Sequence, residues 1–282
     1  MAISNRRIGF VGAGNMGEAI VGALVRAGIV EPGNISVSDV NTDRLIHFSK
    51  TYGVGTLSDN VALFSGSDVV ILAVKPQAMD KVLFEIIAGQ GYEPGRRKIV
   101  ISIAAGVSIE RMEAQLYANL AEAERARMPI VRVMPNTPAL VLEGMSGMSG
   151  NIHALAGDMD VTREILEAMG TVIEFPESDL DAVTAVSGSG PAYVFYLVES
   201  MIAAGEKLGL SAADASQLTL KTLRGAVKLL EDSSESPAEL RRRVTSPGGT
   251  TEAAINHMEE HAVRQRIIEA LTKAAARSRE LG

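Results

Sequence analysis

Three glycines near the start of the chain have the spacing of a phosphate-binding turn. Gly12, Gly14 and Gly17 form the pattern Gly-x-Gly-x-x-Gly between the apolar run Ile8–Val11 and the amphipathic segment Met16–Ala27. At such a strand–helix junction the first glycine permits a tight turn and the second lets the backbone approach a pyrophosphate. The third allows close packing of the helix on the strand. The pattern therefore predicts a dinucleotide site at the amide-rich start of a helix, and the alternative is a turn with a structural role alone.

An acidic residue follows at the distance expected for ribose binding. Ser38 and Asp39 end the second predicted strand, and a carboxylate there usually accepts hydrogen bonds from the adenosine ribose of NAD. A 2′-phosphate instead requires a cation, and Val40, the next residue, supplies none. Arg44, on the following helix, is close enough in sequence to reach such a phosphate. We therefore expect NADH to be favoured, with NADPH as the alternative.

Two further segments suit the binding of anions. Ala73–Pro76 (Ala-Val-Lys-Pro) closes the third predicted strand, at the carboxyl end where open α/β sheets bind ligands. Lys75 there faces cofactor phosphates or a substrate carboxylate, or is a solvated lysine at a strand end. Ser246–Thr251 (Ser-Pro-Gly-Gly-Thr-Thr) predicts a turn whose amides converge before a helix, which is a natural carboxylate cradle. The same residues also fit a helix N-cap formed by Thr250 or Thr251.

The elements that must position these residues change in kind near residue 178. Before this point short apolar runs alternate with amphipathic segments, which predicts a doubly wound parallel sheet with right-handed helical crossovers. Beyond Pro176 we find helical patterns alone, punctuated by Gly209, Ser211 and Ser236-Pro237. We therefore expect an α/β fold with a Rossmann domain over residues 1–178 and an all-α domain over residues 179–282.

The boundaries of the expected elements follow from these patterns. The expected strands are Ile8–Val11, Ile35–Asp39, Val69–Val74, Ile99–Ala104, Ile130–Met134 and Val172–Phe175. The expected helices of the first part include Met16–Ala27, Thr42–Tyr52, Ser108–Leu116 and Val161–Met169. Those of the second part are Pro191–Leu208, three that begin at Ser211, at Ser236 and at Thr250 or Thr251, and Val263–Glu280.

Composition excludes several classes of protein. The net charge of −7 opposes nucleic acid as a partner, because phosphate binding needs a basic surface. The absence of cysteine excludes disulfides, thiolate zinc sites and cysteine nucleophiles, and it fits a reducing compartment. Met1–Ser4 leads into a strand pattern without a leader, and no apolar stretch reaches the roughly 18 residues of a membrane span. We expect a cytoplasmic protein without a nucleic acid or membrane partner.

Other suggestive residues have plainer explanations. His257 and His261 lie four apart on one helical face, but no acidic residue completes a His-Glu-x-x-His motif, so we expect no metal site. The basic run Arg241–Arg243 fits a solvated helix face. Met145 and Met148 are expected in the core.

Five segments together resemble a known family. Arg132–Pro138, Ser187–Tyr193 and Val244–Thr251 join Gly12–Gly17 and Ala73–Pro76 in the order and spacing typical of pyrroline-5-carboxylate reductases. The last segment is the most specific signature of that family, and the resemblance covers nearly the whole chain. It implies NAD(P)H-dependent hydride transfer to the C=N bond of 1-pyrroline-5-carboxylate, which gives L-proline. It also implies an interwoven homodimer, with a higher oligomer of dimers as a further possibility.

The resemblance also assigns residues. It implies that the cofactor, NADPH or NADH, is lined by Val11, Gly12, Ala13, Gly14, Asn15, Met16, Ser38, Asp39, Asn60, Ala73, Val74, Lys75, Pro76, Ala104 and Ala105. It implies that the substrate carboxylate is bound by Ser246, Gly248, Gly249, Thr250 and Thr251. Thr251 is implied as the catalytic residue, through a hydrogen bond to the ring nitrogen. Val40 departs from the arginine that many bacterial relatives carry there, which puts the usual NADPH preference in doubt.

Two rival functions make different demands on the sequence. A two-domain dehydrogenase acting on 3-hydroxy acids requires a lysine about one turn into the first helix of its second domain, and Gly188–Phe195 contains none. A nucleotide-binding sensor without enzymatic activity would keep the glycine turn but has no need for Ser246–Thr251.

Overall fold

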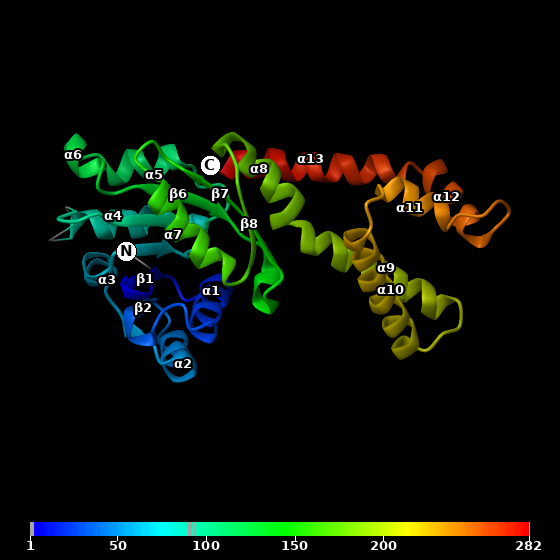
Figure 1. Cartoon of the computed structure of the whole chain (residues 1–282), viewed down its shortest axis with the longest axis horizontal. Helices are drawn as coiled ribbons and strands as arrows, with labels where there is room; N and C mark the ends of the chain where they lie inside the picture. Colours follow the sequence, from blue (N-terminus) through cyan, green and yellow to red (C-terminus); the bar gives the residue numbers. More distant parts are fainter. Residues whose placement is uncertain (1–2, 90–91, 93, 282) are drawn as a thin grey trace. The chain divides into compact units, whose positions relative to one another are not determined.

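The computed structural model describes residues 3–89, 92 and 94–281, so residues 1–2, on which the expectation about a leader partly rests, lie outside it (Figure 1). The chain forms two compact units, the first comprising residues 1–189 and 274–282 and the second comprising residues 190–273. No helix in the described part of the chain is long and apolar enough to cross a membrane.

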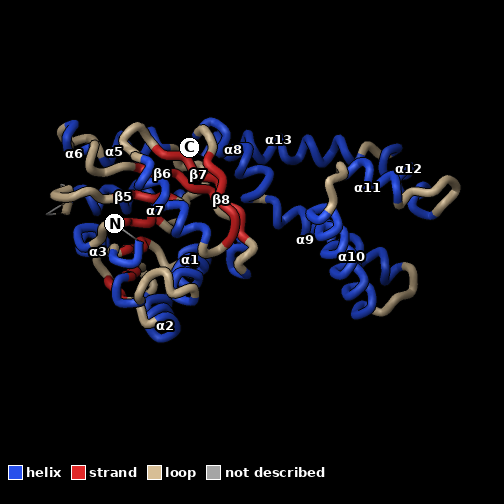
Figure 2. Tube along the Cα trace, viewed as in Figure 1, coloured by secondary structure: helices blue, strands red, loops and turns tan. Residues whose placement is uncertain are grey.

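One eight-stranded sheet, drawn in red in Figure 2, organises the first unit. Its order is β3-β2-β1-β4-β5-β6-β7-β8, and the first six strands of that order run parallel to one another. The strands are β1 Ile8–Val11, β2 Ile35–Ser38, β3 Gly55–Leu57, β4 Val69–Leu72, β5 Ile99–Ser102, β6 Ile130–Met134, β7 Gly144–Gly150 and β8 Gly170–Glu174. The reversal of strand order beside β1 is that of a dinucleotide-binding sheet, so the expected doubly wound fold is confirmed.

Helices cover both faces of this sheet, because its central strands are apolar on both sides. In β4, Val69 and Ile71 pack with one core cluster, whereas Val70 and Leu72 pack with the other. The first cluster includes residues of α1 Asn15–Arg26, α2 Thr42–Tyr52 and α7 Ala156–Glu167. The second includes residues of α3 Asn60–Gly66, α4 Met79–Ala88 and α5 Ile109–Leu116, and a short helix, α6 Glu122–Arg125, precedes β6.

Two strands were not predicted, and the sheet is not wholly parallel. β3 is a short, exposed edge strand. β7 has the sequence Gly-Met-Ser-Gly-Met-Ser-Gly and pairs antiparallel with β6 and parallel with β8. Neither strand has the run of β-branched residues by which strands are recognised in a sequence. Met148 of β7 is buried as expected, whereas Met145 is half-buried. α7 begins at Ala156 rather than at the predicted Val161.

The helices beyond residue 179 agree closely with the sequence patterns. They are α8 Leu180–Val183, a π-helical turn Thr184–Gly188, α9 Gly190–Lys207, α10 Ala212–Asp232, α11 Pro237–Arg243, α12 Thr250–Glu260 and α13 Val263–Leu281. Ser211 and Ser236 cap α10 and α11 by accepting hydrogen bonds from the amides of Asp214 and Glu239. Both caps follow the predicted signals.

The compact units do not divide where the sequence pattern changes. α8 and the π-helical turn belong to the first unit, since Leu180, Thr184 and Ala185 are buried there. Residues 274–282 also belong to it, and the Ser278 hydroxyl donates to Asp181 Oδ1 at 2.7 Å. The functional division at residues 178 and 179 stays a prediction, because compactness alone does not assign function.

Candidate active site

The glycine-rich turn has the conformation that the sequence predicts. Gly12 has a φ of +106°, and a Cβ atom placed on it would lie 2.7 Å from the carbonyl oxygen of Ala73. Its amide donates to the carbonyl oxygen of Ser38 at 2.7 Å, which ties the turn to the end of β2. Only glycine fits this backbone and this close approach. Through these contacts the turn after β1 lies against the ends of β2 and β4, at one edge of the sheet.

The start of α1 offers amides to an anion. Gly14 is the N-cap residue, and no side chain in the described part of the chain caps this helix. Gly14 and Asn15 are exposed, whereas Val11, Gly12 and Ala13 are buried and Met16 is half-buried. No described side chain accepts hydrogen bonds from the amides at this helix start, and the glycine turn below it leaves space that a side chain would occupy. Both features fit the binding of a dinucleotide pyrophosphate.

Asp39 faces the glycine turn. Its Oδ2 atom accepts a hydrogen bond from the amide of Ala13 at 2.7 Å, and its Oδ1 atom accepts from the amide of Asn41 at 2.8 Å. These contacts fix the carboxylate beside the turn, where a ribose held on the turn would meet it. Val40 points into solvent, with 99% of its surface exposed.

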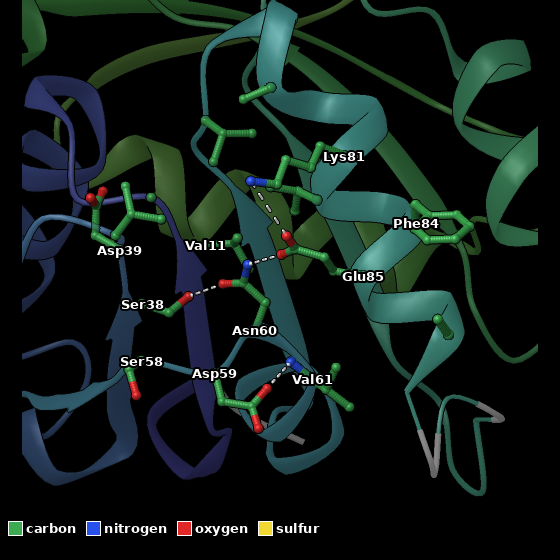
Figure 3. Close-up of a pocket in the computed structure, with 16 residues that line it drawn as sticks. Val11, Ser38, Asp39, Ser58, Asp59, Asn60, Val61, Lys81, Phe84 and Glu85 are labelled. Carbon is green, nitrogen blue, oxygen red and sulfur yellow. Dashed lines mark hydrogen bonds and ion pairs between the residues drawn. The ribbon is translucent and has the colours of Figure 1, made fainter.

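A cavity of about 730 Å³ opens beside this edge of the sheet. Its walls include Ser38, Asp39 and Asn60 as well as Lys81, Phe84 and Glu85 of α4. Figure 3 shows Asn60 between two partners: its Oδ1 accepts from the Ser38 hydroxyl at 2.8 Å, and its Nδ2 donates to Glu85 at 3.1 Å. Lys81 in turn lies 3.9 Å from Glu85. The sequence pattern suggested Ser38 and Asp39, and the family resemblance implied Asn60. Neither indicated the wall from α4, because no local pattern marks it.

The other proposed cofactor residues lie at the carboxyl ends of neighbouring strands. Ala73 and Val74 follow β4 and are half-buried, and Lys75 is exposed before the turn that Pro76 begins. Ala104, buried, and Ala105, half-buried, follow β5. β4 pairs with both β1 and β5, so all three strand ends belong to the same edge. Lys75 makes no ion pair among the described residues, which leaves both of its interpretations open.

The loop before α12 belongs to the second unit. Gly249 is the N-cap residue, and neither Thr250 nor Thr251 caps the helix, so the helix-cap alternative for these threonines is wrong. Gly248 has a φ of +72°, and its amide donates to Glu252 Oε2 at 2.7 Å. The Gly249 amide donates to the carbonyl oxygen of Ser246 at 3.0 Å. The loop is therefore a tight turn before an uncapped helix start.

Two of the family-like segments meet in the first unit, which the sequence did not predict. Asn136 is buried, and its Nδ2 atom donates to the Ser187 hydroxyl at 3.1 Å. Its Oδ1 atom accepts from the amide of Met145 at 2.8 Å. Asn136 thus joins the end of β6, the start of β7 and the π-helical turn. Residues so far apart in the chain give no signal of this contact.

The residues with plainer explanations lie at the surface of the second unit. His257, Glu260 and His261 are exposed, with potential ligand atoms within 4.8 Å of one another. The expectation of no metal site stays a prediction. Arg241, Arg242 and Arg243 are exposed and pair with glutamates, as a solvated helix face requires.

The chain matches two family models and is similar to several known proteins. A family model described as pyrroline-5-carboxylate reductase dimerisation matches residues 177–281. Another, described as NADP oxidoreductase, coenzyme F420-dependent, matches residues 7–106. A pyrroline-5-carboxylate reductase of Corynebacterium melassecola is 40% identical over 98% of this chain and 98% of its own length. One of Pseudomonas aeruginosa is 41% identical over 99% of this chain and 98% of its own.

The chain belongs to the pyrroline-5-carboxylate reductase family. A solved pyrroline carboxylate reductase of Plasmodium falciparum with NADP bound superposes with a TM-score of 0.86, at 31% identity over 99% of each chain. The chain is accordingly an NAD(P)H-dependent oxidoreductase with a Rossmann-like first part. The match to a pyrroline-5-carboxylate reductase dimerisation model supports homo-oligomerisation.

Proposed function

We propose that this chain reduces the C=N bond of 1-pyrroline-5-carboxylate to give L-proline, with NADPH or NADH as the reductant. The observation that carries the proposal is the glycine turn, with its uncapped helix start and Asp39 beside it, in a chain of this family. The bound cofactor supplies a hydride. The cyclic imine is basic, and its protonated form already accepts a hydride well, so the protein mainly has to align the reactants.

The geometry of the first unit supports the proposed cofactor contacts. The amides of Gly14 and Asn15 at the start of α1 bind the pyrophosphate, and Asp39 accepts hydrogen bonds from the ribose hydroxyls. The cavity lined by Asn60 and the α4 residues receives the adenosine. The ends of β4 and β5, with Lys75 and Ala104, line the remainder of the cofactor. The preference for NADH over NADPH stays a prediction.

The proposed substrate contacts lie in the Ser246–Thr251 loop. The amides at the start of α12 bind the substrate carboxylate, because partial positive charge gathers at a helix N-terminus that no described side chain caps. The Thr251 hydroxyl hydrogen-bonds the ring nitrogen and orients the imine. Thr251 is therefore the residue to which we assign a catalytic role, which is to position the imine.

We propose a homodimer formed through the helices of the second unit. Within residues 190–273, all of them described, only Ala215 and Thr219 are buried. Large apolar side chains, by contrast, are exposed on its helices, among them Phe195, Leu220 and Ile267. A helical segment with so little core of its own requires a partner surface. We also propose a cytoplasmic location, since a chain without cysteine fits a reducing compartment.

The test is a spectrophotometric assay of NADPH and NADH oxidation with synthetic 1-pyrroline-5-carboxylate. We expect turnover that depends on the imine and yields proline. A 3-hydroxy acid offered with NAD⁺ or NADP⁺ is the matched control for the rival dehydrogenase. Oxidation of the hydroxy acid without reduction of the imine would contradict the proposal, and so would cofactor binding without either reaction.

A further inference from the structure

Both backbone groups of Ala13, in the middle of the glycine turn, form hydrogen bonds with side chains. Its amide donates to Asp39 Oδ2 at 2.7 Å, and its carbonyl oxygen accepts from Arg44 Nε at 2.7 Å. The carboxylate and the guanidinium therefore bind two atoms of a single residue. Since Asp39 is the proposed ribose acceptor, Arg44 carries its positive charge close to the same ribose.

Arg44 is already engaged by groups of this chain. Beyond the bond to Ala13, its NH2 atom donates to Glu18 Oε2 at 2.5 Å, and its guanidinium carbon lies 5.3 Å from the centre of the Phe48 ring. The side chain retains only 30% exposure. A guanidinium held in this way is oriented towards the turn and neutralised by a carboxylate.

Glu18 is the centre of this cluster. His47 Nε2 lies 2.6 Å from its Oε1 atom, and the Tyr52 hydroxyl donates to the same atom at 3.1 Å. Partial burial raises the pKa of Glu18, but hydrogen bonds from Arg44, His47 and Tyr52 outweigh this and lower it below the usual value. The carboxylate therefore stays ionised at neutral pH and keeps its hold on Arg44.

We propose that Glu18 is the residue that determines cofactor selectivity, because it holds Arg44 on the glycine turn and withholds that cation from a 2′-phosphate. The inference rests on the proposed binding of the cofactor at this turn. Glu18 acts through Arg44 and is a positioning residue. While the Glu18 carboxylate holds Arg44, the site suits the uncharged 2′-hydroxyl of NADH. Without this carboxylate, Arg44 would be free to pair with a 2′-phosphate, which carries up to two negative charges.

The test measures binding of two cofactor fragments to the full-length chain by calorimetry, without substrate. Adenosine 2′,5′-bisphosphate carries the 2′-phosphate, and 5′-AMP differs from it only in lacking that group. Glu18→Gln should raise the affinity for the bisphosphate by roughly tenfold relative to 5′-AMP, the range of a charge-assisted hydrogen bond. The gain should disappear in the double variant Glu18→Gln, Arg44→Gln.

Two further variants sharpen the result. Asp43→Asn removes an exposed carboxylate from the first turn of α2, one residue before Arg44, and should leave the ratio of the two affinities unchanged. Arg44→Gln alone should also leave this ratio within about twofold, because the wild-type guanidinium is already occupied. This last variant tests the proposal even if Glu18→Gln does not fold.

Several results would overturn the inference. They are an unchanged ratio in Glu18→Gln, a gain that survives the loss of Arg44, or a marked fall in bisphosphate binding in Arg44→Gln alone. The last would show that Arg44 already binds the phosphate. Failure of the wild type to bind either fragment would instead overturn the proposed cofactor site. Imine reduction plays no part in the readout, so the two failures are distinguishable.

Discussion

Thr251 occupies the second position of α12, where its hydroxyl is free of any capping role. Replacing it by alanine should therefore leave the free energy of unfolding almost unchanged. Loss of the proposed hydrogen bond to the imine nitrogen should lower turnover by roughly tenfold or more. Steady-state kinetics and thermal unfolding measure the two effects. Thr251→Ser keeps the hydroxyl and should restore most of the rate, and a Thr251→Ala enzyme with the wild-type rate would exclude the proposed role.

Gly12 combines a left-handed backbone with a close neighbour, and a substitution can separate the two effects. Gly12→Ala brings a Cβ atom to 2.7 Å from the Ala73 carbonyl oxygen as well as straining the backbone. Gly28 has a φ of +65° but no atom within 4 Å of the added Cβ. We expect Gly28→Ala to lower the free energy of unfolding by about 1–2 kcal/mol and Gly12→Ala to lower it by about 2–5 kcal/mol. Gly12→Ala should also abolish nucleotide binding. Equal losses in the two variants, measured by denaturation and calorimetry, would show that the close approach to Ala73 does not matter.

The proposed cofactor site is predictable from residue types where its pattern is local in the sequence. The turn Gly12–Gly17 and the acidic Asp39 act through backbone geometry and one strand end, both of which follow from short patterns. The cluster of Glu18 with Arg44 and the contact of Asn60 with Glu85 are different. They join residues 26 and 25 positions apart. Such pairs are set by the packing of α1 on α2 and of α3 beside α4, which one sequence does not specify.

The loop before α12 already holds a carboxylate of its own chain. Glu252 accepts a hydrogen bond from the amide of Gly248, in the loop proposed to bind the substrate carboxylate. Glu252→Gln keeps the size of the side chain but removes a like charge, so the Michaelis constant for the imine should fall several-fold. Glu260→Gln, at the far end of the same helix, is the control. A Michaelis constant that rises with Glu252→Gln would mean that the carboxylate orders the loop.

A buried lysine with a lowered pKa binds the end of α3. Lys98 donates to the carbonyl oxygens of Phe64 and Ser67, and burial lowers its pKa to about 8. The unfolded chain, with a lysine pKa near 10.4, binds more protons between these values. The free energy of unfolding should therefore rise as the pH increases from about 8 to 10, on the order of 2–3 kcal/mol from this group.

Denaturation of Lys98→Met across this range tests that expectation. The variant lacks the two hydrogen bonds at every pH, so its free energy of unfolding should be lower by a constant amount. The part of the pH dependence that Lys98 contributes should be absent. Lys50→Met, at an exposed position of α2, should keep the wild-type slope. Parallel pH profiles for all three proteins would show that Lys98 titrates normally in the folded chain.

Some elements are recognisable from sequence and others exist only through their neighbours. α10 and α11 were predicted because a serine and a Pro or Asp mark their starts. β7 was missed because its residues are small, and a reason lies in packing. A Cβ atom on Gly147 would lie 2.9 Å from Val183 and 3.2 Å from Leu180, so α8 approaches this strand closely. Close approach selects glycine and serine, which are poor strand formers by themselves.

The two units differ in how far their apolar residues are buried. The first unit buries aliphatic side chains on both faces of its sheet. In the second, α9 buries no residue, and α10 buries Ala215 and Thr219 alone. The sequence indicated oligomerisation through this part because its helices are apolar, and the exposure of those side chains supports the same expectation. Which helices pair between copies cannot follow from one chain, since it depends on a second surface.

Dissociation of the proposed homo-oligomer tests this expectation. Leu220 on α10 is 55% exposed, and an aspartate there would place a charge in the proposed interface, where it would lose its hydration. We expect wild type to scatter light with at least twice the 29.8 kDa mass of one chain, and Leu220→Asp to shift towards that mass. Its melting temperature should fall as the protein is diluted, because folding is linked to association. Lys221→Asp, one residue along α10, changes charge without removing apolar surface and is the control. A wild type with a mass near 29.8 kDa at micromolar concentration would mean that these helices remain stable without a partner, contrary to their lack of a core.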